Sequence, residues 1–303
     1  MRIVLSLMVL AALAALPLLL SDYGTGLLIG MVTYVALASA WALFSGPTRY
    51  VSLATVAFYG TGAYCVAVLN DVLPYPAVLA TAALIGAVLA LVVGLSTLRL
   101  AGVYFVIFSF GLSELVRQLI TWYEVNVTGT LGRYIFLDVT ARGIYWQMLA
   151  LAACTIALTA WINRGRLGLA LRVIGDDEVV AAHSGIHLAR MKLIAFTLSA
   201  TILTLAGAIA SPRWVYVEPA IVFNPTVSFL TVIMALLGGA GRLWGPALGA
   251  VPLFLIFEWL SAHFPDTYPI FLGLLFIGVV FVLPDGILAG LDRLRARKRE
   301  GTT

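Results

Sequence analysis

The sequence predicts an all-α polytopic membrane protein with about ten transmembrane helices and one short cytoplasmic helix. Of its 303 residues, 62% are hydrophobic and only 11% are charged. Soluble domains carry about 45–50% apolar and about 25% charged residues, so this chain has too few polar side chains to cover a core in water. If lipid is the solvent, the outer surface can stay apolar. We therefore expect residues 1–303 to form a single membrane domain.

Apolar runs separated by short polar loops supply the predicted spans, because a transmembrane helix needs about 20 mainly apolar residues. The predicted spans are Ile3–Leu20, Leu27–Phe44, Val51–Leu69, Pro76–Thr97, Gly102–Trp122, Ile144–Ile162, Leu193–Pro212, Thr226–Ala240, Trp244–Ala262 and Tyr268–Leu283. The eighth run is short and ends among glycines. Arg2 before the first run resembles the start of a signal peptide, but the run is long and the next follows closely, so we expect a retained span.

The basic residues predict the orientation, because Lys and Arg concentrate in the cytoplasmic loops of membrane proteins. With ten spans and a cytoplasmic N-terminus, fourteen of the eighteen basic residues fall inside: Arg2, Arg49, Arg99, Arg164, Arg166, Arg172, Arg190, Lys192, Arg242, Arg293, Arg295, Arg297, Lys298 and Arg299. The outer side receives the acidic residues Asp22, Asp71, Glu124, Asp138, Glu218 and Asp266. We therefore predict that both termini are cytoplasmic, with a basic tail over residues 285–303.

Cysteine and histidine usage gives no indication of metal or disulfide chemistry. Cys65 and Cys154 lie in apolar runs without a spacing pattern, and His183, His187 and His263 are too scattered to form a metal cluster. The net charge of +4 is dispersed between the apolar runs, which argues against a nucleic-acid surface. We expect neither a metal nor a cofactor.

Two segments are predicted to lie outside the membrane. Residues 123–143 form a mixed-charge outer loop with several glycines, which we interpret as a small cap over the outer mouth. Residues 163–192 form the longest inner segment, and they contain the pattern of a short, sharply bounded helix.

The short inner helix is predicted from its capping residues. Asp176 or Asp177 is suited to the N-cap, and Glu178 lies in the first turn, where the helix dipole favours negative charge. Gly185 is placed to end the helix in a left-handed conformation. The helix has a small apolar face suited to docking in a groove of another protein: Val179, Ala182 and Ile186. An ordinary solvated loop helix is the alternative interpretation.

A nucleotide-binding loop of the form G-x-x-x-x-G-K-[ST] is absent from the sequence. Gly238, Gly239 and Gly241 precede Arg242, but no Lys-Ser/Thr pair follows them. Transport powered by ATP would therefore need a separate ATPase chain, docked on an inner surface such as the short helix.

Several stretches of the sequence carry a family resemblance. They are Ser52–Tyr64 (SLATVAFYGTGAY), Leu98–Glu114 (beginning LRLAGVYF), Gly168–Gly185 with the core Asp176-Asp177-Glu178 and Gly185-Ile186, Leu237–Ala250 (LGGAGRLWGPALGA) and Leu283–Ile287 (LPDGI). In this order, and over nearly the whole chain, they resemble the inner-membrane permeases of branched-chain amino acid ABC importers, specifically the LivM type. Two places depart from the family pattern. Ala54-Thr55 stands where the family usually has Gly-His, and the outer loop reads Thr128-Gly129-Thr130 in place of T-G-G.

The resemblance implies a transport subunit and not an enzyme, in the cytoplasmic membrane of a bacterium or archaeon. It implies three kinds of protein partner: a second homologous permease subunit, two ATPase subunits and an extracytoplasmic solute-binding protein. It assigns coupling to the ATPase to the inner segment, through Gly168, Arg172, Asp176, Asp177, Glu178 and Gly185. The implied substrate is a branched-chain amino acid or a related small solute. Urea, short amides and aromatic acids are the alternatives within the family.

Closely spaced glycines are candidates for helix packing or for lining the pathway. Gly60 with Gly62, and Gly245 with Gly249, allow helices to approach closely where lipid gives no hydrophobic drive to pack them. For Gly238–Gly241, where the short eighth span ends, the alternative is a mobile breakpoint along the pathway.

Three charged residues fall within predicted spans, where charge is costly and is often functional. Glu114 and Arg117 are spaced to pair on one helix face, whereas Glu258 is isolated among aromatic residues. A structural pair or snorkelling group is one interpretation, and a pathway role is the other. The competing functional hypotheses are an ion-coupled secondary transporter with proton sites at Glu114 or Glu258, and a passive channel.

Overall fold

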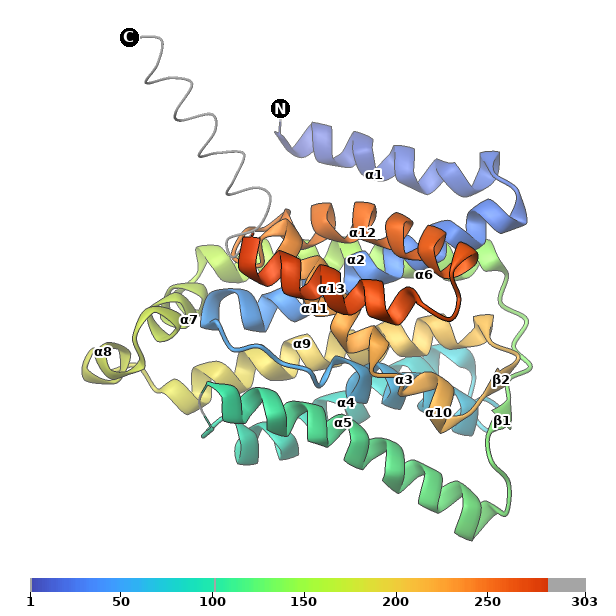
Figure 1. The fold of residues 1–303 in the computed structure, drawn as a ribbon, viewed down its shortest axis with the longest axis horizontal. Coiled ribbons are helices and arrows are strands. Elements are labelled where there is room, and N and C mark those ends of the chain that lie inside the picture. The colour runs from blue at the N-terminus through green and yellow to red at the C-terminus, as the bar shows by residue number, and fades with distance from the viewer. Residues whose placement is uncertain (1, 101, 283–303) are drawn as a thin grey trace.

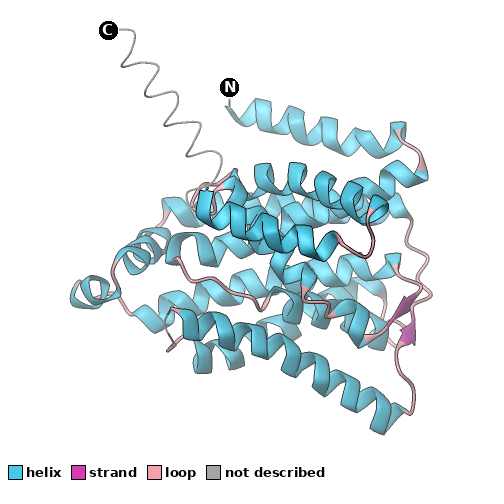
Figure 2. Ribbon diagram, in the orientation of Figure 1, coloured by secondary structure: helices cyan, strands magenta, loops and turns pink. Residues whose placement is uncertain are grey.

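Long apolar helices lie side by side in the computed structural model, which describes residues 2–100 and 102–282 (Figure 1). Apart from two short strands, the described residues form helices and their connections (Figure 2). Helices α7 and α8 lie at one end of the bundle and the strand pair lies at the other (Figure 1). We call these the α8 end and the strand end.

The elements follow one another with short connections. The first part of the chain contains α1 (Arg2–Leu19), α2 (Asp22–Thr48), α3 (Thr55–Leu69), α4 (Tyr75–Thr97), α5 (Val103–Tyr123) and the π-helical turn η1 (Glu124–Thr128). The middle part contains β1 (Arg133–Tyr134), α6 (Ala141–Arg164), α7 (Arg166–Asp176), α8 (Glu178–His183) and α9 (Leu188–Ala210). The last part contains the 3-10 turn η2 (Ser211–Arg213), β2 (Tyr216–Val217), α10 (Pro219–Val222), α11 (Thr226–Gly238), α12 (Gly245–His263) and α13 (Tyr268–Val282). The two strands pair antiparallel, with Tyr134 opposite Tyr216.

Seven helical stretches of the described residues are long and apolar enough to cross a membrane. They are Asp22–Thr48, Tyr75–Thr97, Val103–Thr128, Ala141–Arg164, Leu188–Arg213, Pro219–Gly238 and Gly245–His263. Leu10–Leu19 and Thr55–Leu69 are apolar but shorter, and α13 has 15 residues. The predicted helical membrane fold is confirmed, whereas the count of ten spans and the side of the termini stay predictions.

Two predicted boundaries differ from the helices. α3 begins at Thr55 and not at Val51, because the chain before it is unwound. The short eighth span is extended by α10, so that Pro219–Gly238 forms one apolar stretch. The predicted basic tail over residues 285–303 and the Leu283–Ile287 stretch lie outside the described residues.

α2 and α9 occupy the centre of the molecule. In their apolar windows 72% and 67% of the residues are buried, against 33% in α4, α6 and α12. The outer surfaces are apolar as well, and on α4 they include Leu84, Val92 and Leu95. An apolar exterior around an apolar core is the arrangement that a lipid solvent requires.

The contact between α3 and α9 depends on two glycines. A Cβ atom on Gly62 would overlap the carbonyl oxygen of Thr204, and a Cβ atom on Gly207 would overlap that of Tyr59. Gly60, also on α3, lies against an aromatic ring of the α10–α11 connection. Backbone therefore meets backbone along this contact, which is typical of helix pairs in lipid.

Replacing Gly62 or Gly207 with valine is expected to separate α3 from α9 and to lower the unfolding temperature. The atoms in the way belong to the backbone and cannot rotate aside, so the overpacking costs about 1–3 kcal/mol or more. Gly111→Val on α5 is the matched control, because a Cβ atom there meets no heavy atom of the described residues within 4 Å. Thermal unfolding of the purified chain in detergent checks this. Equal unfolding temperatures for all three variants would contradict the close contact.

α1 is tied to α6 through its own backbone. Pro17 has no N–H, which leaves the carbonyl of Leu13 without its helical partner. The hydroxyl of Tyr145 on α6 donates to that carbonyl at 2.8 Å, and the indole of Trp146 donates to the carbonyl of Ala14 at 3.1 Å. Two aromatic side chains thus satisfy the backbone groups that the proline disturbs.

Candidate functional site

The N-terminal end of α8 is capped by one of the two aspartates that the sequence offers. The N-cap is Asp177 and not Asp176. Its Oδ1 atom accepts hydrogen bonds from the backbone N–H groups of Val179 at 2.7 Å and Val180 at 3.2 Å. These N–H groups have no helical partner of their own, so the carboxylate stabilises the first turn.

The C-terminal end of α8 closes at the glycine that the sequence indicates. Gly185 has φ +79°, a left-handed conformation that favours glycine. The N–H of Gly185 donates to the carbonyl of Ala182 at 3.1 Å, and the N–H of Ile186 donates to that of Ala181 at 3.1 Å. This pattern is a Schellman motif, so α8 is bounded sharply at both ends.

α7 docks α8 onto the bundle, and it is not among the helices predicted from the sequence. Leu171 and Ile174 are the buried side chains of α7. A Cβ atom on Gly168 would overlap the carbonyl oxygen of Ile162 in α6, and one on Gly175 would overlap a backbone carbonyl in the last turn of α2. Gly168, predicted as a coupling residue, therefore lies where α7 meets α6.

The outward side of α8 is apolar. Val179 is 65% exposed and Val180 is 54% exposed, and Ala182 is exposed beside them. Ile186, which the sequence places on the docking face, is only half-exposed, so Val180 takes its place on this face. Adjacent exposed valines on a helix that projects from the bundle are suited to pack into a groove of another protein (Figure 1).

Glu178, Lys192 and Tyr50 form a cluster between α8 and the bundle, which we call the Glu178 cluster. The Nζ atom of Lys192 lies 2.5 Å from Oε1 of Glu178, and the Lys192 side chain is only 4% exposed. Lys192 also donates to the hydroxyl of Tyr50 at 2.9 Å and lies 4.4 Å from the centre of its ring. Tyr50 in turn donates to Glu178 at 2.6 Å. Burial, together with this hydrogen bond, raises the pKa of Tyr50 and keeps its hydroxyl protonated.

The remaining predicted coupling residues make exposed contacts. Asp176 pairs with Arg49 at 2.8 Å, and both side chains are largely exposed. Arg172 donates to the carbonyl of Asn163 at 3.4 Å. An exposed ion pair contributes about 0–1 kcal/mol, so these contacts hold the α8 region less firmly than the Glu178 cluster does.

The unwound segment 49–54 connects the Glu178 cluster to α3, and serines from other helices bond its backbone. The N–H of Leu53 donates to Oγ of Ser109 on α5 at 2.9 Å. The carbonyl of Leu53 accepts from Ser113 on α5 at 3.2 Å and from Ser228 on α11 at 2.9 Å. A backbone without helical hydrogen bonds is tolerated at membrane depth only when protein groups satisfy it. These serines are not among the site residues predicted from the sequence.

The glycines of the α11–α12 hairpin pack against one another. A Cβ atom on Gly238 would overlap the carbonyl oxygen of Gly245, and one on Gly249 would lie 2.5 Å from the nitrogen of Gly238. Gly239 ends α11 with φ +99°, and a Cβ atom on Gly241 would meet no heavy atom within 4 Å in the part of the chain that the structure describes. The hairpin is therefore tight at its base and open at Gly241.

The three charged residues of the predicted spans form one pair, Glu114 with Arg117 on α5, and one separate residue, Glu258 on α12. Glu114 on α5 accepts from Nε of Arg117 at 2.9 Å and from Gln118 at 2.8 Å, an arrangement typical of a structural pair. Glu258 lies on α12 and is half-buried. Within residues 2–100 and 102–282, no group of three or more His, Cys, Asp or Glu residues is placed to hold a metal ion.

The loop at the strand end is anchored by a buried carboxylate. The Glu124 side chain is fully buried and accepts from Nε of Arg133 at 2.9 Å. Thr128 donates to the backbone carbonyl of Glu124 at 2.6 Å, and Gly129 follows with φ +73°. The Thr128-Gly129-Thr130 departure therefore lies where η1 ends.

Comparison with known proteins places this arrangement in a family. The family described as branched-chain amino acid transport system / permease component matches residues 23–280. The chain belongs to this family. It is accordingly a multi-pass membrane permease component of ABC importers, and it is not itself catalytic.

Individual relatives agree with this assignment. The high-affinity branched-chain amino acid transport system permease protein LivM of Salmonella typhimurium is 27% identical over an alignment of 318 residues. This alignment covers 93% of this chain and 74% of the relative. LivM of Escherichia coli is 27% identical over 290 residues, covering 84% of this chain and 67% of the relative. LivH of Escherichia coli is 29% identical over 150 residues, covering 49% of this chain and 47% of the relative. No solved structure gives a significant match.

Proposed function

We propose that this permease is one of two homologous membrane subunits of an ATP-driven importer for branched-chain amino acids or a closely related small solute. Two ATPase subunits bind at the α8 end, and a solute-binding protein docks at the strand end. The observation that carries the proposal is α8: it is capped at both ends, apolar on its outward side and tied to the bundle by the Glu178 cluster. Urea, short amides and aromatic acids are the alternative solutes, and their binding to the partner solute-binding protein distinguishes them.

In this proposal, movement of the ATPase reaches the bundle through the Glu178 cluster. Glu178 on α8 contacts Lys192 in the first turns of α9 and Tyr50 just after α2. Tyr50 lies in the unwound segment 49–54, and α3 follows that segment. Because α3 packs backbone to backbone on α9, a push on α8 acts on both helices together.

The proposed topology has ten spans in a single domain, with both termini and the α8 end in the cytoplasm. α1, α3 and α13 supply the three spans that are shorter than the others. The cytoplasmic coupling segment is residues 163–192, and the outer loop is residues 123–143. The positive-inside rule supports this orientation, since Arg49, Arg172 and Lys192 all lie at the α8 end.

A carboxylate on the outward side of α8 is expected to detach the ATPase without unfolding the permease. Val179→Asp and Val180→Asp each place an unpaired charge where we propose that a groove of the ATPase closes on the helix. Burying an unpaired charge costs several kcal/mol, so binding is expected to weaken about a hundredfold or more. Co-purification of the ATPase with a tagged permease from membranes checks this.

Val215→Asp is the matched control for this experiment, because Val215 is also 65% exposed but lies at the strand end, beside β2. This variant is expected to retain the ATPase. If both α8 variants retained the ATPase as well as Val215→Asp does, the assignment of α8 as the coupling helix would be wrong.

A further inference from the structure

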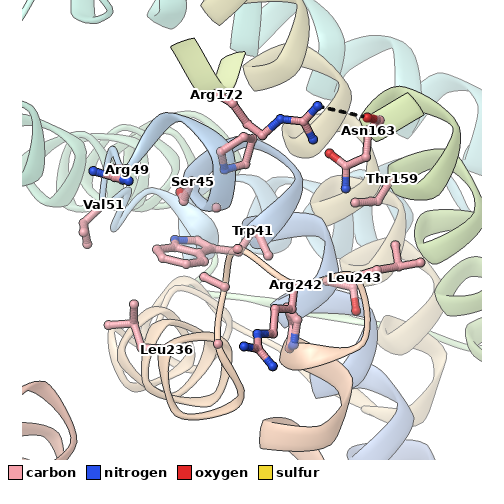
Figure 3. Close-up of a pocket in the computed structure, with 18 of the residues that line it drawn as sticks. Trp41, Ser45, Arg49, Val51, Thr159, Asn163, Arg172, Leu236, Arg242 and Leu243 are labelled. Carbon is pink, nitrogen blue, oxygen red and sulfur yellow. Dashed lines mark hydrogen bonds between the residues drawn. The ribbon is translucent and has the colours of Figure 1, made fainter. Parts of the chain in front are cut away.

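A large cavity lies at the α8 end, bounded by the last turns of α2 and α6, by α7 and by the α11–α12 connection (Figure 3). Its volume is about 770 Å³. Apolar side chains form part of its wall, among them Trp41, Val51, Leu236 and Leu243. Ligand pockets in proteins have volumes of about 300–1,000 Å³, so the space is large enough for a ligand well above the size of one small amino acid.

Arginines from three separate elements line this cavity. They are Arg49 after α2, Arg172 on α7 and Arg242 in the α11–α12 connection. Asp176 is the acidic residue of the lining, so its charged side chains carry a net charge of +2. The planar guanidinium group matches the geometry of phosphate and carboxylate oxygens, which it binds through paired N–H donors.

Two buried serines on α2 contribute further polar atoms to the cavity lining. Ser39 and Ser45 are each 4% exposed, and neither Oγ atom has a hydrogen-bond partner among the described residues. Elsewhere on α2, Thr33 and Thr48 bond back to their own helix at 2.7 and 2.6 Å. Buried hydroxyls are nearly always bonded. Four other buried hydroxyls of the described residues, on Thr55, Tyr64, Thr97 and Thr197, are also unpartnered but do not line the cavity. The two serines therefore add to the polarity of this wall, and the arginines and the volume are what indicate a ligand.

We propose that this cavity binds the headgroup of an anionic phospholipid, with the phosphates against the arginines and an acyl chain along the apolar wall. The cavity lies at the level where α2, α6 and α11 end and α12 begins, which is the level of the headgroups in a bilayer. Basic pockets between transmembrane helices are suited to such lipids. Cardiolipin, which carries two phosphates, is the anionic lipid that we propose for this cavity.

Native mass spectrometry of the full chain in mild detergent tests this proposal. Cardiolipin is expected to stay bound with a stoichiometry of one, whereas phosphatidylcholine is not. Arg172→Gln and Arg242→Gln are each expected to weaken cardiolipin binding about fivefold, the factor that corresponds to about 1 kcal/mol per basic residue. Arg190→Gln is the matched control at the same end of the molecule, because Arg190 is exposed and does not line the cavity. Equal binding by all three variants would overturn the proposal.

A cavity-filling variant separates a specific site from general attraction to a basic surface. Thr159→Phe adds a ring to the α6 wall and changes no charge, and the hydroxyl it removes bonds only to its own helix at 2.8 Å. It is expected to weaken cardiolipin binding at least as much as the arginine variants do. Unchanged binding would place the lipid elsewhere and overturn the proposal.

Competition experiments distinguish the lipid from a small anion or a transported solute. Inorganic phosphate or leucine, added alone at millimolar concentration, is expected to leave both bound cardiolipin and the unfolding temperature unchanged. Displacement of cardiolipin by either compound would assign the cavity to a small solute and overturn the lipid proposal. Each variant is first compared with the unmodified chain by thermal unfolding in phosphatidylcholine alone, which separates lost binding from lost folding.

Discussion

Replacing Lys192 with methionine is expected to leave a folded permease that carries at least tenfold less solute for each ATP hydrolysed by the importer. Methionine keeps a similar length but removes the ammonium group that holds Glu178 at 2.5 Å and Tyr50 at 2.9 Å. Loss of a hydrogen bond to a charged group costs about 1.5–3 kcal/mol. About 1.4 kcal/mol is a factor of ten in an equilibrium constant. The equilibrium between α8 held against α9 and α8 displaced from it therefore shifts at least tenfold toward the displaced position. Solute uptake and phosphate release in proteoliposomes that contain the whole importer measure the ratio.

Two companion variants show whether the effect comes from the Glu178 cluster. Arg190→Met changes an exposed basic residue in the same part of α9 and is expected to leave the ratio of solute to ATP unchanged. Tyr50→Phe removes only the hydroxyl that bonds Glu178 and Lys192, and we expect an intermediate loss. It also tests the cluster if Lys192→Met fails to fold. A normal ratio in both Lys192→Met and Tyr50→Phe would exclude the cluster as the route of coupling.

The long helices were predictable because lipid imposes a rule that acts along a single stretch of chain. A lipid-facing helix must be apolar over about 20 residues whatever its neighbours are. The predicted span Pro76–Thr97 therefore matches α4 at Tyr75–Thr97, and Ile144–Ile162 lies within α6 at Ala141–Arg164. The start of α3 was not predictable in this way. Val51 is as apolar as a spanning residue, but the chain around it is unwound because serines of distant helices bond its backbone.

Residues of the candidate site were predictable where their role is local. Asp177 and Gly185 cap a helix that lies between them, so their spacing alone indicates what they do. Tyr50 and Lys192 reach the site only through the fold, since they lie 142 residues apart in the chain. α7 is an intermediate case: Leu167, Leu171 and Ile174 follow a helical spacing, but Gly168 and Gly175 are poor helix formers. Those glycines are present because α7 lies directly on the ends of α2 and α6.

Replacing Ser228 with alanine is expected to destabilise the start of α3 and to lower both the unfolding temperature and transport. The N-cap of α3 is Ala54, which has no side chain to bond the first turn. Ser228 on α11 takes over this role: its Oγ atom accepts from the N–H of Val56 at 2.9 Å and donates to the carbonyl of Leu53 at 2.9 Å. Ser228 is buried, so its loss leaves the N–H of Val56 without a partner, at a cost of about 1–3 kcal/mol.

Thr231→Val is the matched control for Ser228→Ala, because it removes a hydroxyl that is buried on the same helix less than one turn away. The Thr231 hydroxyl donates only to the carbonyl of Val227 in its own helix, at 2.7 Å. That carbonyl belongs to a helical turn, so removing the hydroxyl costs much less than leaving the N–H of Val56 unpaired. We therefore expect Ser228→Ala to lower the unfolding temperature clearly more than Thr231→Val, and to reduce transport where Thr231→Val does not. Equal effects would mean that the unwound segment keeps its shape without Ser228, and that the Glu178 cluster then acts on α9 alone.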